Sequence, residues 1–166
     1  MSDKTVSLSI LVENTVSWNS LRAEHGFSVW IDSPDGGMLW DTGQTPLFEE
    51  NAQKMGVDIR QPACVALSHG HYDHTGGLSA TLNMRPGLHV YGHPDLFRQR
   101  YSKSRDNGLS IRPIGSPLTA ECVREKQATL MCSVTPLEII PGIHLTGEIP
   151  RETGFEIGRA SCRERV

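Results

Sequence analysis

The chain has 166 residues, of which 37% are hydrophobic and 21% charged, and its formal net charge is −3. This length suits one domain, and the absence of a long basic stripe argues against nucleic acid or an anionic membrane as a partner. No stretch reads as a transmembrane span, and the first residues lack the basic start and cleavage site of a signal peptide. The sequence therefore predicts a cytoplasmic protein.

The first part of the chain has the signals of three strands followed by a helix. Residues 6–12 alternate well enough to form a strand. Residues 27–31 and 38–40 are two further predicted strands, joined by a Pro-Asp-Gly turn. The Thr-Pro pair at 45–46 predicts a helix start, with threonine as the cap and proline as the first helical residue, and Gly56 ends that helix.

The second part of the chain begins with a continuous apolar run over residues 63–67, which predicts a central buried strand. Strand–helix–strand order combined with antiparallel hairpins predicts a mixed-sheet α/β domain. The remaining predicted elements are, in order, a helix over 77–84, a strand over 88–92, a helix from His93 to about Arg100, a charged loop over 101–105, and weak strands at Ile111, 137–140 and 143–146.

Three histidines and an aspartate follow the apolar run within six residues, at His69, His71, Asp73 and His74. In an extended segment side chains alternate, so the first three project to one side and His74 reaches a second position. Two imidazoles suit zinc or iron(II), and a carboxylate beside a third imidazole suits a harder ion. The pattern therefore predicts a centre for two divalent ions that share a water, whereas the alternative interpretation is a polar loop of solvated histidines.

The spacing His69-x-His71-x-Asp73-His74, followed by two glycines, resembles the signature of the metallo-β-lactamase superfamily. Asp41, within a Leu-Trp-Asp-Thr-Gly segment, resembles the strand-ending aspartate motif that precedes this signature in the superfamily. The resemblance implies that His69 and His71 bind a first metal and that Asp73 and His74 bind a second. It also implies that Asp41 steadies the ligand loop without touching metal, although a carboxylate that caps a turn is the alternative.

Three further segments narrow the resemblance. Residues 11–15, 24–28 and 147–151 are similar to a branch of metal-dependent hydrolases that includes the dihydropterin ribofuranosyl-aminobenzene phosphate synthase-like proteins. The resemblance covers roughly residues 5–156. It implies a four-layer αββα sandwich, two bound divalent metals (most simply zinc, with iron or manganese as alternatives) and a small-molecule substrate.

The superfamily completes its metal centre with later ligands, among them a further histidine and a bridging aspartate, and the sequence has no matching segment. His144 reads as part of a strand rather than as a ligand. The chain is therefore interpreted as the N-terminal half of the sandwich, with a partial domain over residues 1–157 and a non-native or disordered tail over residues 158–166. One sheet without its partner leaves an apolar face uncovered, which predicts marginal stability and self-association.

Other residues are candidates for contact with substrate. His25 and His93 are placed at the rim of the site, although His93 could instead serve to start a helix. A basic cluster could grip a phosphate or carboxylate, or could simply be a solvated face. Its members are Arg98, Arg100, Lys103 and Arg105.

The sequence is compatible with four functions. The leading one is a metal-dependent hydrolase that attacks an ester, amide or phosphoester with a metal-activated water, with Asp73 or a bound water handling the proton. The branch resemblance implies a synthase or transferase that acts on a pterin-linked phosphate. A catalytically incomplete fragment that binds one metal weakly is a further alternative. Asp41 in Asp-Thr-Gly also matches the aspartic proteases, which need two such carboxylates and hence a dimer.

Overall fold

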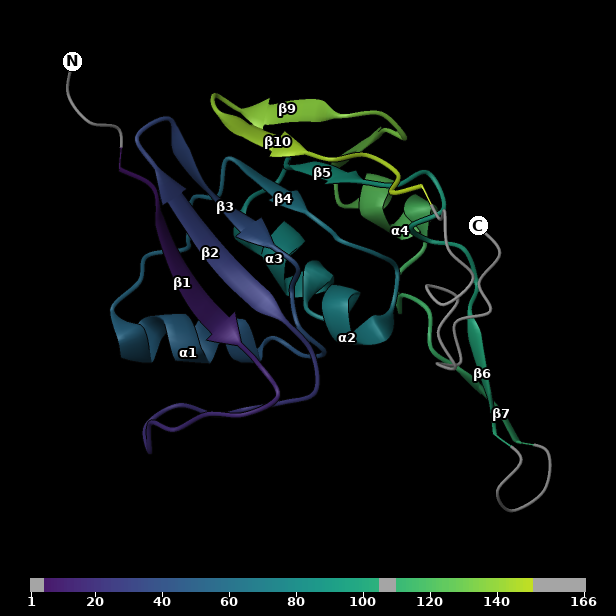
Figure 1. Cartoon of the computed structure of the whole chain (residues 1–166), viewed down its shortest axis with the longest axis horizontal. Coiled ribbons are helices and arrows are strands. Elements are labelled where there is room, and N and C mark those ends of the chain that lie inside the picture. The colour runs from purple at the N-terminus through teal and green to yellow at the C-terminus, as the bar shows by residue number, and fades with distance from the viewer. Residues whose placement is uncertain (1–4, 105–109, 151–166) are drawn as a thin grey trace.

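The computed structural model describes residues 5–104 and 110–150, so the predicted tail over 158–166 lies outside the described residues. Six strands form one mixed sheet (Figure 1). Their order across the sheet is β1 (Ser7–Val12), β2 (Ser28–Ser33), β3 (Gly36–Trp40), β4 (Cys64–Ala66), β5 (His89–Gly92) and β8 (Thr129–Cys132). The pairs β1–β2 and β2–β3 are antiparallel, and β3, β4, β5 and β8 run parallel. The mixed-sheet α/β prediction is confirmed.

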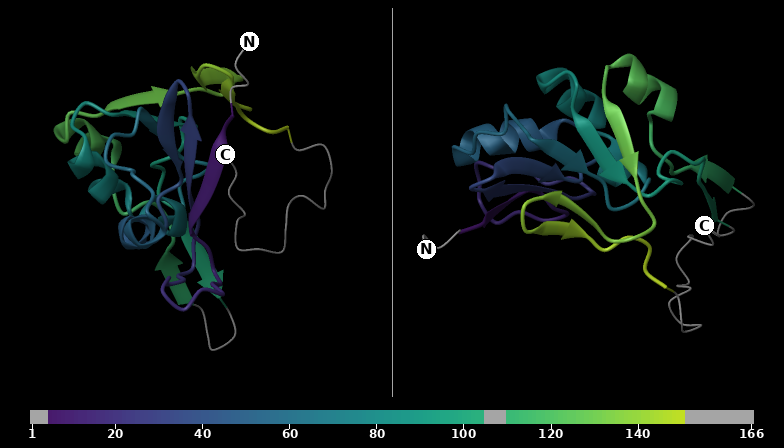
Figure 2. Two further views of the ribbon diagram at one scale, coloured as in Figure 1. Left: turned by 90° about the vertical axis from the view of Figure 1, so that its left-hand side faces the viewer. Right: turned by 90° about the horizontal axis from the view of Figure 1, so that it is seen from above.

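Helices cover one face of this sheet (Figure 2). Leu39, Val65 and Val90 point from the centre of the sheet into the core beneath them and are fully buried. A left-handed Gly56 ends the first helix, as the sequence predicts. The helices are α1 (Leu47–Met55), α2 (Tyr72–Thr75), α3 (Leu78–Met84) and α4 (Ala120–Glu125).

The opposite face is covered by a two-stranded sheet of β9 (Leu137–Ile140) and β10 (Ile143–Leu145), seen at the top of Figure 1. This hairpin closes a second, smaller core, in which Ile140 packs with Met38, Cys64, Ala66 and Tyr91 of the large sheet. The described residues thus contain one large sheet, its helical layer and a short second sheet over the other face.

Two local predictions were wrong. The helix expected from His93 to Arg100 is a turn, because the guanidinium of Arg100 folds back and donates to the carbonyls of Asp95, Leu96 and Arg98. The expected loop after residue 100 is instead a hairpin of β6 (Tyr101–Ser104) and β7 (Ser110–Pro113). The sequence reading also missed α4 and β8.

The strand directions decide where chemistry can occur. Because β3, β4 and β5 are parallel, their carboxyl ends lie at the same edge of the sheet. Asp41 follows β3, Ser68 and His69 come shortly after β4, and His93 follows β5. The fold therefore carries the residues singled out in the sequence to one edge.

The edge strand β1 leaves an apolar surface uncovered. Leu8 and Ile10 project on the same face, are 67% and 55% exposed, and belong to a strand whose residues 5–12 carry no charge. An uncharged edge strand with an apolar face is a template for pairing with another strand. We expect two copies of the chain to associate through β1, because antiparallel pairing of identical strands would bring both apolar faces together.

The double variant Leu8→Lys, Ile10→Lys is expected to raise the monomer fraction, measured by analytical ultracentrifugation. Ile111→Lys is the matched control, since Ile111 on β7 is 56% exposed but lies away from the large sheet. A wild-type chain that is monomeric at micromolar concentration contradicts the expectation.

Among the helices that the structure describes, none has the length and apolar character needed to cross a bilayer.

Candidate metal centre

The ligand-rich loop changes conformation halfway along its length. His71 is extended (φ −81, ψ 152) and caps the single helical turn α2, so Asp73 and His74 belong to a helix. The expectation of an extended segment through Asp73 was wrong. The physical reason is the carbonyl of His71, which accepts hydrogen bonds from the amides of His74 and Thr75 and from the Thr75 hydroxyl.

The first donor pair is formed by His69 and His71. His69 Nε2 and His71 Nδ1 are 2.9 Å apart, and the ring centroids are 4.5 Å apart. On its other side, His69 Nδ1 lies 3.0 Å from the hydroxyl of Ser68. Two imidazole nitrogens this close are suited to sharing one proton or one cation.

The second donor pair is formed by Asp73 and His74. Asp73 Oδ2 and His74 Nε2 are 3.5 Å apart. The His74 ring lies close to the first pair, with its centroid 4.2 Å from that of His69. The three rings are therefore gathered at the sheet edge rather than dispersed over the surface, and the two pairs adjoin each other.

Asp41 links the two pairs from beneath. Its carboxylate is 1% exposed and accepts hydrogen bonds from the amide and hydroxyl of Ser68, both at 2.7 Å, and from His74 Nδ1 at 2.8 Å. Since the Ser68 hydroxyl donates to Asp41, it must accept from His69 Nδ1. His69 and His74 thus donate outward from Nδ1 and turn Nε2 toward the centre, which is how ligand histidines are oriented in metal sites, whereas His71 turns its Nδ1 toward His69.

The surroundings shift the pKa values of His69 and His74 in opposite directions. Burial, followed by the neighbouring His74 and His71 rings, lowers the pKa of His69 to about 4, so this ring is uncharged at neutral pH. Burial also acts to lower the pKa of His74. However, its hydrogen bond to Asp41 and the charges of Asp41 and Asp73 outweigh burial, so the pKa of His74 is raised. An uncharged imidazole is the form that binds metal.

The backbone around the pairs leaves little room. Gly26 has φ +139, a conformation that essentially only glycine adopts, and a Cβ there would lie 2.2 Å from the carbonyl oxygen of Asp73. Phe27 follows and donates its amide to that same carbonyl at 3.3 Å. The segment before β2 is thus packed directly against the ligand loop.

Gly26→Ala is expected to destabilise the protein by at least about 1–3 kcal/mol, because backbone strain and a contact with Asp73 arise together. Denaturant unfolding measures the change. Gly56→Ala is the control, since Gly56 also has positive φ (+71) but no atom within 4 Å of its ideal Cβ position. Equal losses in the two variants would mean that contact with the ligand loop adds nothing.

The two residues predicted at the rim have different surroundings. His25 reaches the second pair, with Nε2 3.3 Å from Asp73 Oδ2. His93 sits at the same sheet edge, where its Nδ1 accepts from the amide of Asp95 at 3.1 Å. Its Nε2 is buried without a hydrogen bond, 3.9 Å from Glu148 Oε2.

The residues of the predicted basic cluster do not form one exposed patch among the described residues. Arg100 is 8% exposed and holds the backbone turn described above. Arg105 lies outside the described residues. His144, in β10, is 3.9 Å from Glu138, and the β9–β10 hairpin covers the sheet face opposite the helices. Neither Arg100 nor His144 therefore adds a donor to the two pairs.

Within residues 5–104 and 110–150, no group of three or more His, Cys, Asp or Glu is arranged to hold a metal ion as it stands. The donors nevertheless fit divalent metals in their chemistry. They provide imidazole nitrogens and a carboxylate oxygen, with outward hydrogen bonds that fix the rings. The arrangement corresponds to two incomplete metal sites, each with two donor residues.

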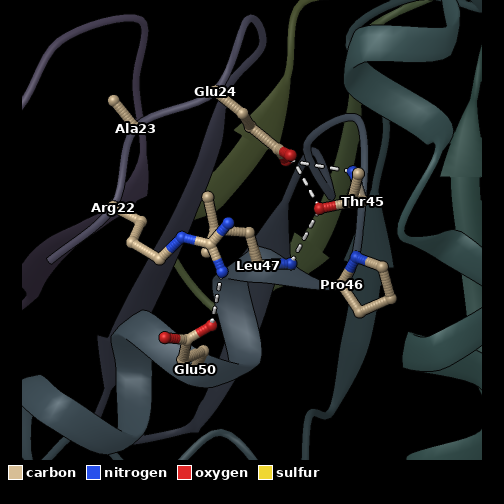
Figure 3. Close-up of a pocket in the computed structure, with 7 residues that line it drawn as sticks. All are labelled: Arg22, Ala23, Glu24, Thr45, Pro46, Leu47 and Glu50. Atoms are coloured by element: carbon tan, nitrogen blue, oxygen red, sulfur yellow. Dashed lines mark hydrogen bonds and ion pairs between the residues drawn. The ribbon is translucent and has the colours of Figure 1, made fainter.

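A cavity of about 340 Å³ lies beside this region and is shown in Figure 3. It is lined by Arg22, Ala23, Glu24, Thr45, Pro46, Leu47 and Glu50, and contains none of the donor residues. Glu24 in its wall accepts from the amides of Gln44 and Thr45 and from the Thr45 hydroxyl. The cavity therefore marks the anchor of the loop that carries His25 rather than the metal centre.

Sequence reasoning assigned no role to Ser68 or Glu24. The Ser68 hydroxyl lies between Asp41 and His69 and contacts both. The sequence feature that could have indicated this role is the position of Ser68 between a buried strand and the first histidine. Glu24 accepts hydrogen bonds from Thr45 and so holds the loop before β2 against the start of α1. Apart from its position in a segment that resembles a family motif, nothing in the sequence indicated this role.

Comparison with known families gives the decisive observation. Residues 21–124, more than half of the chain, match the family model described as the metallo-beta-lactamase superfamily. The chain belongs to this superfamily. The matched range contains the strand-ending Asp41 and both donor pairs.

Individual relatives agree with this assignment. An uncharacterized protein of Methanocaldococcus jannaschii is 32% identical over 93% of this chain and 58% of its own length. The 7,8-dihydropterin-6-methyl-4-(beta-D-ribofuranosyl)-aminobenzene-5'-phosphate synthase of the same organism is 24% identical over 89% of this chain and 52% of its own length. A crystal structure described as a metal-dependent hydrolase of the beta-lactamase superfamily has a TM-score of 0.59 and 31% identity, covering 80% of this chain and 44% of that one. The chain spans about half the length of the relatives that it matches.

Proposed function

We propose that the chain carries the metal-binding half of a cytoplasmic, metal-dependent hydrolase that acts on an ester, amide or phosphoester bond of a small molecule. The observation that carries the proposal is the pair of adjoining donor sets at one sheet edge, His69 with His71 and Asp73 with His74. Membership of the metallo-β-lactamase superfamily supports it, as does the likeness to a structure described as a metal-dependent hydrolase.

Some of these residues would bind the metal ions, and Asp41 would orient a ligand. His69 and His71 would hold a first divalent ion, and Asp73 and His74 a second, with zinc the simplest choice for imidazole donors. When bound, such ions lower the pKa of a coordinated water toward neutrality and polarise the bond that it attacks. Asp41 keeps the proton of His74 on Nδ1. The Asp73 carboxylate would accept a proton from the attacking water.

One relative favours a second candidate function. The dihydropterin-linked phosphate synthase is similar over most of this chain, so a synthase or transferase acting on a pterin-linked phosphate is the alternative for the whole protein. A third outcome applies to these 166 residues alone. With two donors per ion among the described residues, the chain could bind metal without turnover.

The deciding experiment measures metal content and hydrolysis in one preparation. The chain is loaded with zinc, dialysed and analysed by mass spectrometry for metal, and then assayed with bis(p-nitrophenyl) phosphate and a simple lactone. The double variant His69→Ala, His71→Ala is the negative control, and His144→Ala is the matched control for removing an exposed imidazole elsewhere.

About two zinc ions per chain, with hydrolysis that the double variant loses, is the expected result. One weakly held ion without hydrolysis supports the incomplete fragment. Zinc content that is equal in the wild type and the double variant overturns the proposal, because the ions would then be bound elsewhere.

A further inference from the structure

Two segments that carry no part of the donor pairs converge on Asp73. One contains Asn14 and the other His25. Asn14 Oδ1 lies 2.9 Å from His25 Nδ1, and on the other side of the ring His25 Nε2 lies 3.3 Å from Asp73 Oδ2. The imidazole thus bridges the loop after β1 and the second donor pair.

The orientation of the Asn14 amide is fixed by Glu13. Asn14 Nδ2 donates to Glu13 Oε1 at 3.1 Å, while the amide and hydroxyl of Thr15 donate to Glu13 Oε2. These hydrogen bonds, from Thr15 first and then Asn14, lower the pKa of Glu13 to about 2, so it is a permanent acceptor at neutral pH. With its nitrogen directed to Glu13, Asn14 presents its oxygen to His25, and an oxygen can only accept.

The proton of a neutral His25 ring therefore sits on Nδ1, and Nε2 presents a lone pair to the Asp73 carboxylate. His74 has the same arrangement, because its Nδ1 donates to Asp41 and its Nε2 faces the same carboxylate oxygen. The Nε2 atoms of His25 and His74 thus both face Asp73 Oδ2, at 3.3 and 3.5 Å. A cation bound between these atoms would have two imidazole nitrogens and one carboxylate oxygen as donors, a set that suits a divalent metal.

The loop that bears His25 is fastened at both sides of the histidine. Glu24 accepts from the amides of Gln44 and Thr45, each at 3.0 Å, and Phe27 donates to the carbonyl of Asp73. The backbone of residue 25 is therefore held beside the second pair. The ring itself is 65% exposed, so its rotamer is free to change.

We propose that His25 Nε2 is a third donor to the divalent cation held by Asp73 and His74, with Asn14 orienting the ring. The proposal rests on the proposed metal-binding function and deepens it. In the structure these three side chains are not arranged to coordinate one metal ion. The exposed His25 ring therefore changes its rotamer when the cation binds, so that Nε2 points at the ion. Outward donation from Nδ1 to a fixed oxygen is the arrangement by which proteins orient ligand histidines.

The test measures zinc affinity by competition with a chelator, for each of the two equivalents, together with the number of imidazoles around zinc by X-ray absorption. Neither readout requires catalytic activity. His25→Ala is expected to weaken the second equivalent by more than about 100-fold and to leave the first unchanged. Asn14→Leu, which keeps the ring but removes its acceptor, is expected to weaken the second equivalent by about 10–100-fold. His144→Ala is the control and should change neither.

The possible outcomes distinguish a failure of the His25 proposal from a failure of the proposed metal-binding function. A second equivalent bound equally well by wild type and His25→Ala overturns the role of His25 and leaves the metal centre standing. A wild-type chain that binds no zinc overturns both. Loss of one imidazole per chain in His25→Ala, which is half an imidazole per zinc when two ions are bound, supports direct ligation if circular dichroism is unchanged.

Discussion

Replacing Asp41 by alanine is expected to destabilise the protein by about 3–5 kcal/mol, which is the usual cost of removing one partner from a buried charged network. The carboxylate is buried and accepts three hydrogen bonds, from two groups of Ser68 and from His74 Nδ1. Its loss leaves these donors without their acceptor at the base of the site. Because whole domains are stable by only about 5–15 kcal/mol, the change is a large fraction of the total.

Denaturant unfolding with and without zinc is the measurement. Asp41→Asn separates charge from backbone conformation, since asparagine also tolerates the positive φ of 57 at this position. It should lose less stability than alanine but still weaken zinc binding by about 10–100-fold, because it no longer presents a carboxylate to His74. Asp32→Ala, at an exposed position of β2, should stay within about 0.5 kcal/mol of wild type. An unchanged unfolding midpoint in Asp41→Ala contradicts the role assigned to the carboxylate.

The clustering of histidines after a buried strand and the centre of the sheet could be predicted because their signals are local. A continuous apolar run before His69 indicated the buried strand β4, and the Pro-Asp-Gly turn indicated the β2–β3 hairpin. Asp41 was also recognised, as an acid that follows an apolar strand. Parallel strands then bring these separate signals to one edge without further information.

The remaining errors arose where particular side-chain contacts or weak apolar patterns override the local preference. The His93–Arg100 segment has a helix-start sequence, yet Arg100 satisfies its carbonyls from the side and holds a turn. A weak strand was predicted at Ile111, which lies in β7, but its partner β6 was missed because Tyr101–Ser104 has no alternation of apolar residues. The contact between His25 and Asp73 joins residues that lie far apart in the sequence, and spacing alone could not place it.

Zinc is expected to stabilise the wild-type chain against unfolding and to lose most of this effect in His71→Ala. A ligand that binds only the folded state adds about 2.7 kcal/mol when its free concentration is 100 times its dissociation constant. For a chain of this size that is roughly 5–10 °C in the midpoint of thermal unfolding. His71 supplies Nδ1 to the first pair, and without it His69 Nε2 has lost the partner donor 2.9 Å away.

Differential scanning calorimetry in a zinc titration makes the measurement. Asp73→Ala removes the shared oxygen of the second pair, so His71→Ala and Asp73→Ala should each retain part of the zinc effect while the double variant retains none. His144→Ala should behave as wild type, since that imidazole lies in β10, apart from both pairs. If zinc raises the midpoint of the double variant as much as that of the wild type, the ions bind outside the histidine loop. The cluster of rings would then serve only to pack the sheet edge over Asp41.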